Sequence, residues 1–217
     1  MQPHQPYVFM GGTFDPVHNG HLRTALELQQ WLDVPAIHLV PSRSPVHRGV
    51  PGCTAQQRLE MLQLAVADEP ALVADDREIR SAQDSYTLYT LQGLRQELGV
   101  TVPICMIMGM DAYHTLPDWH EWQAFIQYCH LLVVARPGYQ PDAASALADF
   151  SRKHRAEAPE QLWQAPAGRI LFHQLTPLGI SATQVRTAIN SGVSPRYLLP
   201  DPVWHYIQSH HLYGLTN

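Results

Sequence analysis

Short runs of apolar residues alternate with amphipathic stretches along most of the chain, and this alternation limits the folds open to it. The clearest apolar runs are 7–10, 36–40, 104–108 and 131–135, and shorter ones lie at 71–74 and 170–175. Runs that are apolar throughout are typical of parallel strands buried on both faces of a sheet. Parallel strands need crossover connections, which are usually helices and run right-handed. We therefore expect an α/β fold with a parallel sheet and helices on both of its faces.

Helical signals fill the intervals between the expected strands. Helices are expected at about 20–32 and 54–66, then one that carries Leu88 to Leu98, one at about 182–190 and a further one from residue 201. Thr54 precedes Gln57 by three residues, the spacing of a capping box. Ser85 and Thr87 are candidate N-caps for the third helix. Residues 137–168 are rich in alanine, proline and charge, which indicates a surface loop and a helix.

Length, charge and cysteine content limit the classes of protein to which the chain can belong. A length of 217 residues suits one domain over 1–217, with a small helical part at about 180–217. A net charge of −5 argues against nucleic acid or an anionic membrane as a partner. Three cysteines without CxxC spacing favour buried thiols over disulfides or a zinc finger. Because no run of 18 apolar residues and no leader pattern occur, we expect a cytoplasmic protein.

The segment GGTFDPVHNGH, residues 11–21, lies where the first strand ends and the first helix begins. Glycines let the backbone approach a ligand closely, and a helix N-terminus favours anions. His18 and His21 are three residues apart, so both can face one side of a helical turn. Two imidazoles there can donate hydrogen bonds to oxygens that gain charge during phosphoryl transfer. A lone histidine is more often a packed one, but packing does not explain the surrounding glycines. Asp15 is expected to form the turn rather than to act as a base.

A second candidate segment, Gly179–Arg186, lies at the start of a predicted helix. Ser181 can cap this helix, and Thr183 adds a hydroxyl in its first turn. Arg186 follows Thr183 by three residues and so falls on the same face. Hydroxyls, amides and a guanidinium in this arrangement can clamp a polyphosphate. Taken alone, the segment is explained equally well by an ordinary capped helix with an exposed arginine.

Together the two segments resemble the paired signatures of the T/HxGH nucleotidyltransferase superfamily. His18-Asn19-Gly20-His21 is similar to the T/HxGH core, and Ile180–Arg186 to the ISSTxxR motif, with Ala182 in place of the second serine. The resemblance implies a Rossmann-like fold and transfer of an adenylyl or cytidylyl group. It also implies that the two histidines and Arg186 are catalytic and form no covalent intermediate. Class I aminoacyl-tRNA synthetases have a related motif, but their partner loop is lysine-rich, and this chain has one lysine.

The same resemblance implies an ATP site. Its residues are Gly11, Gly12, Thr13, Phe14, His18, His21, Gly109, Asp111, Ile180, Ser181, Thr183 and Arg186. Gly109 and Asp111 follow an apolar strand, and the carboxylate can accept hydrogen bonds from ribose hydroxyls. Mg²⁺ is expected as a cofactor, held mainly through ATP phosphates, because the chain shows no dedicated metal site.

Further segments resemble the bacterial nicotinate-nucleotide adenylyltransferase family over nearly the whole chain. Residues 85–91 match its SYTxxTL segment and residues 116–120 its Pro-x-Trp segment. Residues 41–48 are similar to its loop after the second strand, with arginine where the family often has lysine. The implied nicotinate mononucleotide-binding residues are Ser42, Arg48, Tyr86, Thr87 and Trp119. Without the resemblance, these segments indicate a solvated basic loop, an N-cap and a packed tryptophan.

The implied reaction joins ATP and nicotinate mononucleotide to give deamido-NAD and pyrophosphate, in NAD biosynthesis. The nucleotide 5′-phosphate would attack the α-phosphorus of ATP in line. A sister adenylyltransferase acting on nicotinamide mononucleotide or phosphopantetheine is an alternative. So is a regulatory module that binds a nucleotide without turning it over, although binding alone does not require both histidines and Arg186. No oligomeric state is indicated.

Overall fold

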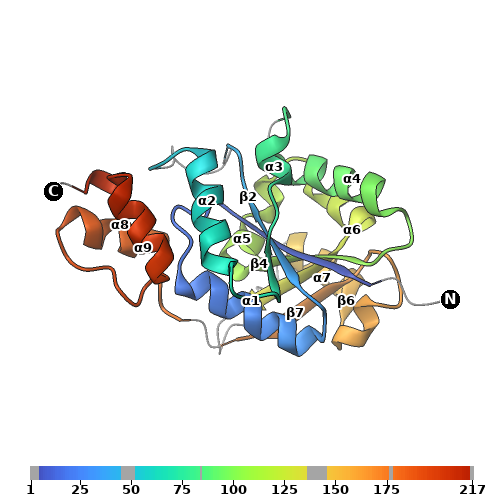
Figure 1. Cartoon of the computed structure of the whole chain (residues 1–217). Helices are drawn as coiled ribbons and strands as arrows, with labels where there is room; N and C mark the ends of the chain where they lie inside the picture. The colour runs from blue at the N-terminus through green and yellow to red at the C-terminus, as the bar shows by residue number, and fades with distance from the viewer. Residues whose placement is uncertain (1–4, 45–51, 84, 136–145, 176–177, 216–217) are drawn as a thin grey trace. The chain divides into compact units, whose positions relative to one another are not determined.

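The computed structural model describes residues 5–44, 52–83, 85–135, 146–175 and 178–215 (Figure 1). The strands are β1 (Tyr7–Gly12), β2 (Ile37–Pro41), β3 (Leu72–Ala74), β4 (Ile104–Gly109), β5 (His130–Ala135), β6 (Arg155–Ala156) and β7 (Ile170–Gln174). Their order in the sheet is β3-β2-β1-β4-β5-β7-β6. Each pair with a described register is parallel, for example Val8 opposite Cys105 and Met106 opposite Leu131. The structure thus has the expected α/β, Rossmann-like parallel sheet.

The helices connect these strands and cover them. They are α1 (Asn19–Leu32), α2 (Ala55–Val66), α3 (Arg77–Arg80), α4 (Thr87–Leu98), α5 (Met110–His114), α6 (Phe125–Tyr128), α7 (Ala146–His154), α8 (Ala182–Asn190) and α9 (Asp201–Ser209). Short 3-10 turns lie at η1 (Leu116–Asp118), η2 (Trp122–Ala124), η3 (Pro159–Leu162) and η4 (Leu212–Gly214). No helix of the described ranges is long and apolar enough to span a membrane.

Backbone contacts divide the chain into two compact units. The first comprises residues 1–11 and 83–176, and the second residues 12–82 and 177–217. The single domain expected from the length stays a prediction, and each unit is described by itself.

The first unit is built on β4 and β5. Every residue of β4 except Gly109 is buried, as is typical of a strand covered on both faces. Helix α5 packs on β4 and β5, and α4 packs on α6 (Figure 1). Gly99 ends α4 with a positive φ of 85°, as helix C-termini favour.

The second unit contains the N-terminal helices and the C-terminal helices. Helix α2 begins with the predicted capping box, in which the Thr54 hydroxyl accepts the Gln57 N–H and the Gln57 side chain accepts the Thr54 N–H. One face of α2 packs on β2 and β3, and α9 lies beside α2 (Figure 1). Turn η4 contacts both α8 and α9. The expected C-terminal helical part is therefore present.

Two expectations about local structure need correction. Neither Ser85 nor Thr87 caps α4, because Tyr86 is the N-cap and makes no side-chain capping bond. Thr87 is already the first helical residue, so its hydroxyl is one position too late. The region 137–168 contains the expected helix, α7, but also the two-residue strand β6, which is too short to give a periodic pattern. Its first residues lie outside the described ranges.

A buried histidine ties the start of β5 to a distant segment. The side chain of His130 is fully buried, with Nε2 at 2.9 Å from the carbonyl oxygen of Ala165. Nδ1 accepts the N–H of Arg169 at 3.1 Å, so the neutral ring already satisfies both partners. Burial lowers the pKa of His130 from 6.5 to about 4.

This pKa predicts how stability changes with pH. Between pH 6.5 and 4 the unfolded chain binds a proton at His130 that the folded chain does not bind. The free energy of unfolding should therefore fall as the pH falls through this window, by about 3 kcal/mol from this group. In urea titrations at pH 7, 6 and 5, His130→Gln should lose less stability than the wild type over the same interval. Equal losses for the two proteins would contradict the prediction.

Candidate active site

The turn between β1 and α1 is shaped by a close approach of Phe14 to Gly12. A Cβ on Gly12 would lie 3.1 Å from Cζ of Phe14, so a larger residue would displace the ring. Phe14 is buried with a positive φ of 50°, an uncommon conformation for a bulky residue. Its ring meets the ring of His21 edge-on, with 5.0 Å between the centroids. The first candidate segment therefore has one compact arrangement, in which Phe14 supports His21.

The two histidines lie together at the N-terminus of α1. His18 is the N-cap residue, and its carbonyl oxygen accepts the N–H of His21 at 2.9 Å. The two rings stack with 3.6 Å between centroids and 21° between planes, so they face one side as expected. Burial lowers the pKa of His18 to about 4, and the ring is neutral near pH 7. A neutral His18 avoids repulsion between two stacked cations and retains one N–H donor.

Gly20 brings the second candidate segment against the first. A Cβ at this position would lie 3.0 Å from Nδ1 of His18 and 3.3 Å from the carbonyl oxygen of Ile180. Because glycine has no side chain, the His18 ring and the Ile180 carbonyl oxygen can both lie close to the backbone of residue 20. Residues of the two segments, at least 158 positions apart in sequence (179 minus 21), are thus neighbours in the structure.

The start of α8 carries the arginine of the second segment. Ser181 is the N-cap, and its hydroxyl accepts the N–H of Gln184 at 3.1 Å. Nη2 of Arg186 donates to Oγ1 of Thr183 at 3.3 Å, which places the two on one helix face as expected. Nη1 of Arg186 donates to the backbone oxygen of Asp15 at 2.6 Å. Arginine has five N–H donors, so this anchored guanidinium can also bind an anion.

Asp15 is buried and surrounded by donors. One carboxylate oxygen accepts the N–H of Gly52 at 2.8 Å, and the other accepts the hydroxyl of Tyr213 at 2.8 Å. Nη1 of Arg186 is 3.7 Å from the carboxylate. With both oxygens bound in this way, the carboxylate serves the turn rather than a proton transfer.

Arg58 is an organising residue that motif reasoning did not identify. It is fully buried, donating from Nη1 to the carbonyl oxygen of Thr13 and from Nη2 to those of Ser42 and Arg43. Burial lowers its pKa, but the ordinary pKa of arginine is so high that it stays charged. The guanidinium thereby joins the turn after β1 to the segment after β2. Only its position on a predicted helix was visible in the sequence.

Asn19 is a second residue whose role the motif did not reveal. Its side-chain amide donates to the carbonyl oxygen of Tyr197 at 2.9 Å, and its backbone N–H donates to that of Leu198 at 2.8 Å. These bonds join the first residue of α1 to the chain between α8 and α9. Asn19 lies between the two histidines, so its position alone could have drawn attention to it.

Ser42, predicted to bind the nucleotide, lies next to the glycine turn. Its N–H donates to the carbonyl oxygen of Gly12 at 2.9 Å. Its buried hydroxyl has no hydrogen-bond partner among the described residues, which is uncommon for a buried polar atom. Arg48, the other residue predicted in this segment, lies outside the described residues.

The first unit contains the remaining predicted residues. Gly109 ends β4, and Asp111 is exposed in the first turn of α5, at the strand's carboxyl end as expected. Tyr86 precedes α4, whose N-terminus has no side-chain cap. The polar N–H groups there favour an anion.

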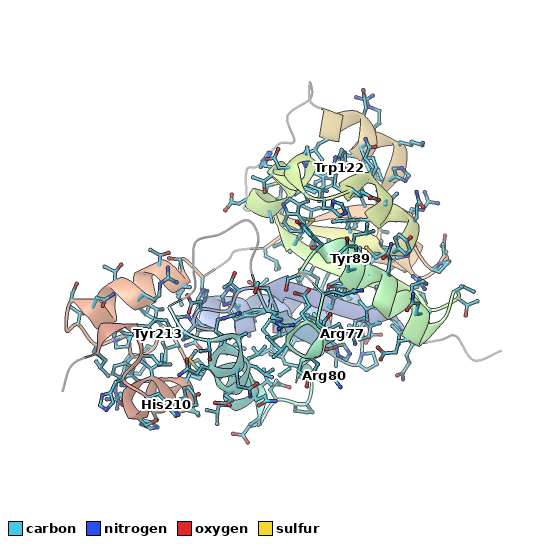
Figure 2. The ribbon with its side chains drawn as sticks, turned by 90° about the horizontal axis from the view of Figure 1, so that it is seen from above. Arg77, Arg80, Tyr89, Trp122, His210 and Tyr213 are labelled. Carbon is cyan, nitrogen blue, oxygen red and sulfur yellow. The ribbon has the colours of Figure 1, made fainter. Side chains whose placement is uncertain are left out.

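An aromatic group surrounds Tyr86 within this unit. Its ring centroid is 4.8 Å from that of His120 and 5.7 Å from that of Tyr89, which Figure 2 labels on α4. Trp119 is half-buried and meets Phe125 edge-on at 6.3 Å. Sequence reasoning missed His120 and Tyr89, although His120 directly follows Trp119 and Tyr89 is two positions after Thr87. The start of α4 and residues 119–120 therefore lie next to one another.

Comparison with known proteins identifies close relatives. Residues 9–188 match the family model described as cytidylyltransferase-like. A protein of Hahella chejuensis named probable nicotinate-nucleotide adenylyltransferase is 48% identical over 218 residues, covering 100% of both chains. A Marinomonas protein of the same name is 47% identical and covers 94% of this chain and 92% of its own.

Solved structures share the fold at low sequence identity. The nicotinic acid mononucleotide adenylyltransferase of Plasmodium falciparum, complexed with NaAD, superposes with a TM-score of 0.72 at 15% identity. The match covers 98% of this chain and 99% of that one. A putative nicotinate-nucleotide adenylyltransferase from Vibrio parahaemolyticus gives a TM-score of 0.63 at 13% identity, covering 98% and 97%.

Replacing Gly20 tests whether the placement of His18 matters. Gly20→Ala puts a Cβ 3.0 Å from Nδ1 of His18 and should displace the ring. We expect turnover, measured as pyrophosphate release from ATP with the second substrate, to fall on the order of tenfold or more, because small misplacements are costly in catalysis.

The matched control is Gly93→Ala, at an exposed helix position where an added Cβ meets nothing within 4 Å. This variant should keep its turnover and gain about 0.5–1 kcal/mol of stability. If Gly20→Ala were as active as Gly93→Ala, the ring's position would be irrelevant to turnover.

Proposed function

The chain belongs to the nicotinate-nucleotide adenylyltransferase family, within the cytidylyltransferase-like proteins, and we propose how its residues carry out that family's reaction. It is a nucleotidyltransferase of NAD biosynthesis that joins ATP and nicotinate mononucleotide to give deamido-NAD and pyrophosphate. The roles proposed for individual residues rest on one observation, the arrangement of side chains at the turn between β1 and α1. Stacked His18 and His21 lie beside the start of α8, and Arg186 of that helix is bound to the turn through Asp15.

The triphosphate of ATP is proposed to bind over the turn formed by Gly11, Gly12, Thr13 and Phe14. The N-terminus of α1 supports this proposal, because its N-cap makes no side-chain capping bond and the positive end of the helix dipole favours an anion there. Ile180, Ser181, Thr183 and Arg186 supply the opposing contacts. The guanidinium, already oriented by two hydrogen bonds, loses little freedom when it binds an anion.

Chemistry is proposed to proceed as one in-line displacement. A 5′-phosphate oxygen of nicotinate mononucleotide bonds to the α-phosphorus of ATP as the bond to the pyrophosphate oxygen breaks. A phosphate monoester is largely a dianion near pH 7 and needs no general base. His18 and His21 donate hydrogen bonds to the phosphate oxygens that gain charge, and Arg186 neutralises the departing pyrophosphate. Catalysis is then positioning combined with charge stabilisation.

Mg²⁺ is proposed as the cofactor. Among the described residues no group of three or more His, Cys, Asp or Glu side chains could hold a metal. Imidazole, hydroxyl and guanidinium donors line the turn, and this set fits Mg²⁺ bound mainly by phosphate oxygens and water. When bound, the ion supplies neutralisation of triphosphate charge.

The residues proposed to bind the nicotinate nucleotide are Ser42, Arg48, Tyr86, Thr87 and Trp119. The uncapped start of α4, at Tyr86 and Thr87, suits the nicotinate carboxylate. The half-exposed indole of Trp119 can stack on the pyridine ring. Ser42 and Arg48 are proposed for the nucleotide's phosphate, and Asp111 with Gly109 for the ribose of ATP. We also propose the cytoplasm, where ATP is available, as its location.

Removing either imidazole tests the catalytic roles. His18→Ala and His21→Ala should each lower kcat on the order of 10²-fold, the scale of losing one transition-state donor. His210→Ala is the matched control, because this exposed histidine, labelled in Figure 2, lies at the end of α9. Near wild-type turnover in either turn variant would reject the assignment.

A substrate panel separates the candidate reactions. Pyrophosphate release from ATP is measured with nicotinate mononucleotide, nicotinamide mononucleotide or phosphopantetheine, each at the same concentration. We expect the highest kcat/KM with the nicotinate nucleotide, because the start of α4 favours a carboxylate over an amide. A preference for either other substrate would identify a sister enzyme. ATP binding without pyrophosphate release in any mixture would indicate a regulatory module.

A further inference from the structure

Tyr213, near the C-terminus, makes a buried hydrogen bond to the turn after β1. Its hydroxyl donates to Oδ1 of Asp15 at 2.8 Å, and the two residues are only 7% and 6% exposed. They are 198 positions apart in the sequence. Figure 2 labels Tyr213 beside the C-terminal helices. A hydrogen bond to a buried charged group is among the stronger ones in proteins.

The backbone around Tyr213 adopts an uncommon conformation. Tyr213 has a φ of 59° and His211 a φ of 49°, both in the left-handed region. For a bulky residue this conformation is unfavourable and persists where surrounding contacts impose it. Gly52 provides one such contact, since a Cβ there would lie 2.8 Å from Cδ1 of the tyrosine ring. The ring is thus held between the 52–53 segment and the turn.

The phenol remains a proton donor at every physiological pH. Burial raises the pKa of Tyr213 far above its ordinary value, and burial raises the pKa of Cys53 to about 12. The Cys53 sulfur lies 3.1 Å from the tyrosine oxygen and 3.3 Å from Oδ1 of Asp15. Because both groups stay neutral, Asp15 is the acceptor in this cluster.

Asp15 in turn holds two parts of the candidate active site. Its backbone oxygen accepts Nη1 of Arg186, and its Oδ2 accepts the N–H of Gly52. A shift of Asp15 would therefore move both its backbone oxygen, which holds Arg186, and its carboxylate, 3.7 Å from Nη1 of this arginine. Of the hydrogen bonds made by the Tyr213 hydroxyl, the one to Asp15 is the bond that leads to this arginine.

We propose that Tyr213 is a positioning residue for the adenylyl transfer, acting through Asp15 on the orientation of Arg186. The inference rests on the function proposed above. It assigns to the C-terminal turn η4 a part in catalysis that no motif of the sequence contains. Tyr213→Phe should therefore impair turnover more than it impairs folding.

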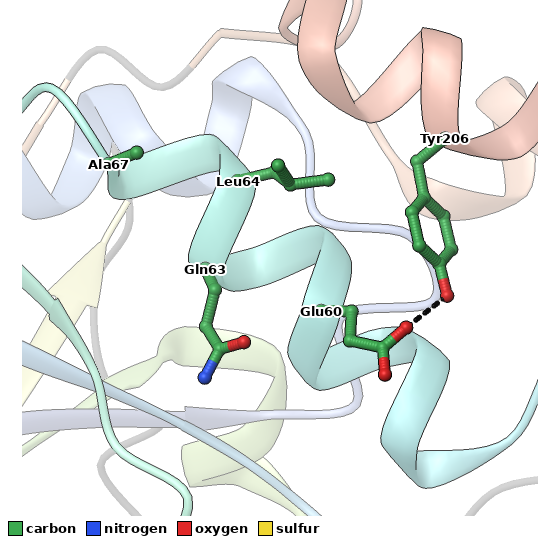
Figure 3. A pocket seen from close by; sticks show the side chains of 5 residues that line it. All are labelled: Glu60, Gln63, Leu64, Ala67 and Tyr206. Atoms are coloured by element: carbon green, nitrogen blue, oxygen red, sulfur yellow. Dashed lines mark hydrogen bonds between the residues drawn. The ribbon is translucent and has the colours of Figure 1, made fainter.

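The chain offers a matched control in Tyr206. Its hydroxyl donates to the carboxylate of Glu60, joining α9 to α2 at a surface pocket with Gln63, Leu64 and Ala67 (Figure 3). Tyr206→Phe removes the same kind of phenol–carboxylate bond from the same unit, but this bond is made to Glu60 of α2 and not to Asp15. A purely structural role predicts similar behaviour for the two phenylalanine variants.

The experiment is a double-mutant cycle read by steady-state kinetics. The proteins are the wild type, Tyr213→Phe, Tyr206→Phe, Asp15→Asn and the Tyr213→Phe/Asp15→Asn double variant. Pyrophosphate release gives kcat and the KM of each substrate, and thermal unfolding gives Tm. We expect Tyr213→Phe to lower kcat about tenfold, the scale of a small misplacement, with little change in the KM of nicotinate mononucleotide. In the Asp15→Asn background it should have no further effect.

Two results would overturn the proposal. One is a kcat for Tyr213→Phe equal to that of Tyr206→Phe, and the other is an undiminished effect in the Asp15→Asn background. The wild type in the same assay tests the proposed function separately, because only its failure to release pyrophosphate rejects that function. Should Tyr213→Phe not fold, Gly52→Ala displaces the same ring, and a folded variant with wild-type kcat rejects the proposal.

Discussion

The hydrogen bonds around Asp15 are the constraint on which the candidate site depends. A single buried aspartate accepts donors from the 52–53 segment, from η4 and, through its carbonyl oxygen, from α8. Arg58 completes the arrangement by binding the carbonyls of Thr13 and Ser42. Together with the bonds from Asn19 to Tyr197 and Leu198, these hydrogen bonds hold segments that are distant in sequence against one another. The stacked histidines and Arg186 thereby gain a fixed spacing before any substrate binds.

Because the protein is acidic, we propose that individual groups near the turn, and not its overall charge, attract the polyphosphate. The chain carries a net charge of −5, so long-range attraction does not draw ATP in. We propose that the N-terminus of α1 and one anchored guanidinium supply the attraction instead. His18 contributes as a neutral donor, since burial lowers its pKa to about 4. Fixed dipoles and neutral donors of this kind stabilise the negative charge that develops on the phosphate oxygens. They do so without the mutual repulsion that several neighbouring cations would have.

Sequence patterns predicted individual strands and helices, and they missed the hydrogen bonds between residues that are far apart in the sequence. The strands at 104–108 and 131–135 follow from continuous apolar runs, and α8 begins where Ser181 can cap it. Helices α3, α5 and α6 have four or five residues, too few for a period to show. The bond between Tyr213 and Asp15 spans 198 positions and leaves no spacing signal. Motif reasoning therefore supplied the residues proposed to bind substrate, and the structure added residues such as Arg58 and Tyr213 that hydrogen-bond to the same turn.

The stereochemical course at the α-phosphorus tests the central claim, a single in-line displacement within a preset site. A single diastereomer of ATP with sulfur on the α-phosphate can be converted with nicotinate mononucleotide, and the product's configuration determined by phosphorus NMR. The account predicts inversion, because one nucleophile replaces pyrophosphate without an enzyme-bound intermediate. Net retention would show two successive displacements, and a covalent adenylyl-enzyme would contradict the roles given to His18, His21 and Arg186.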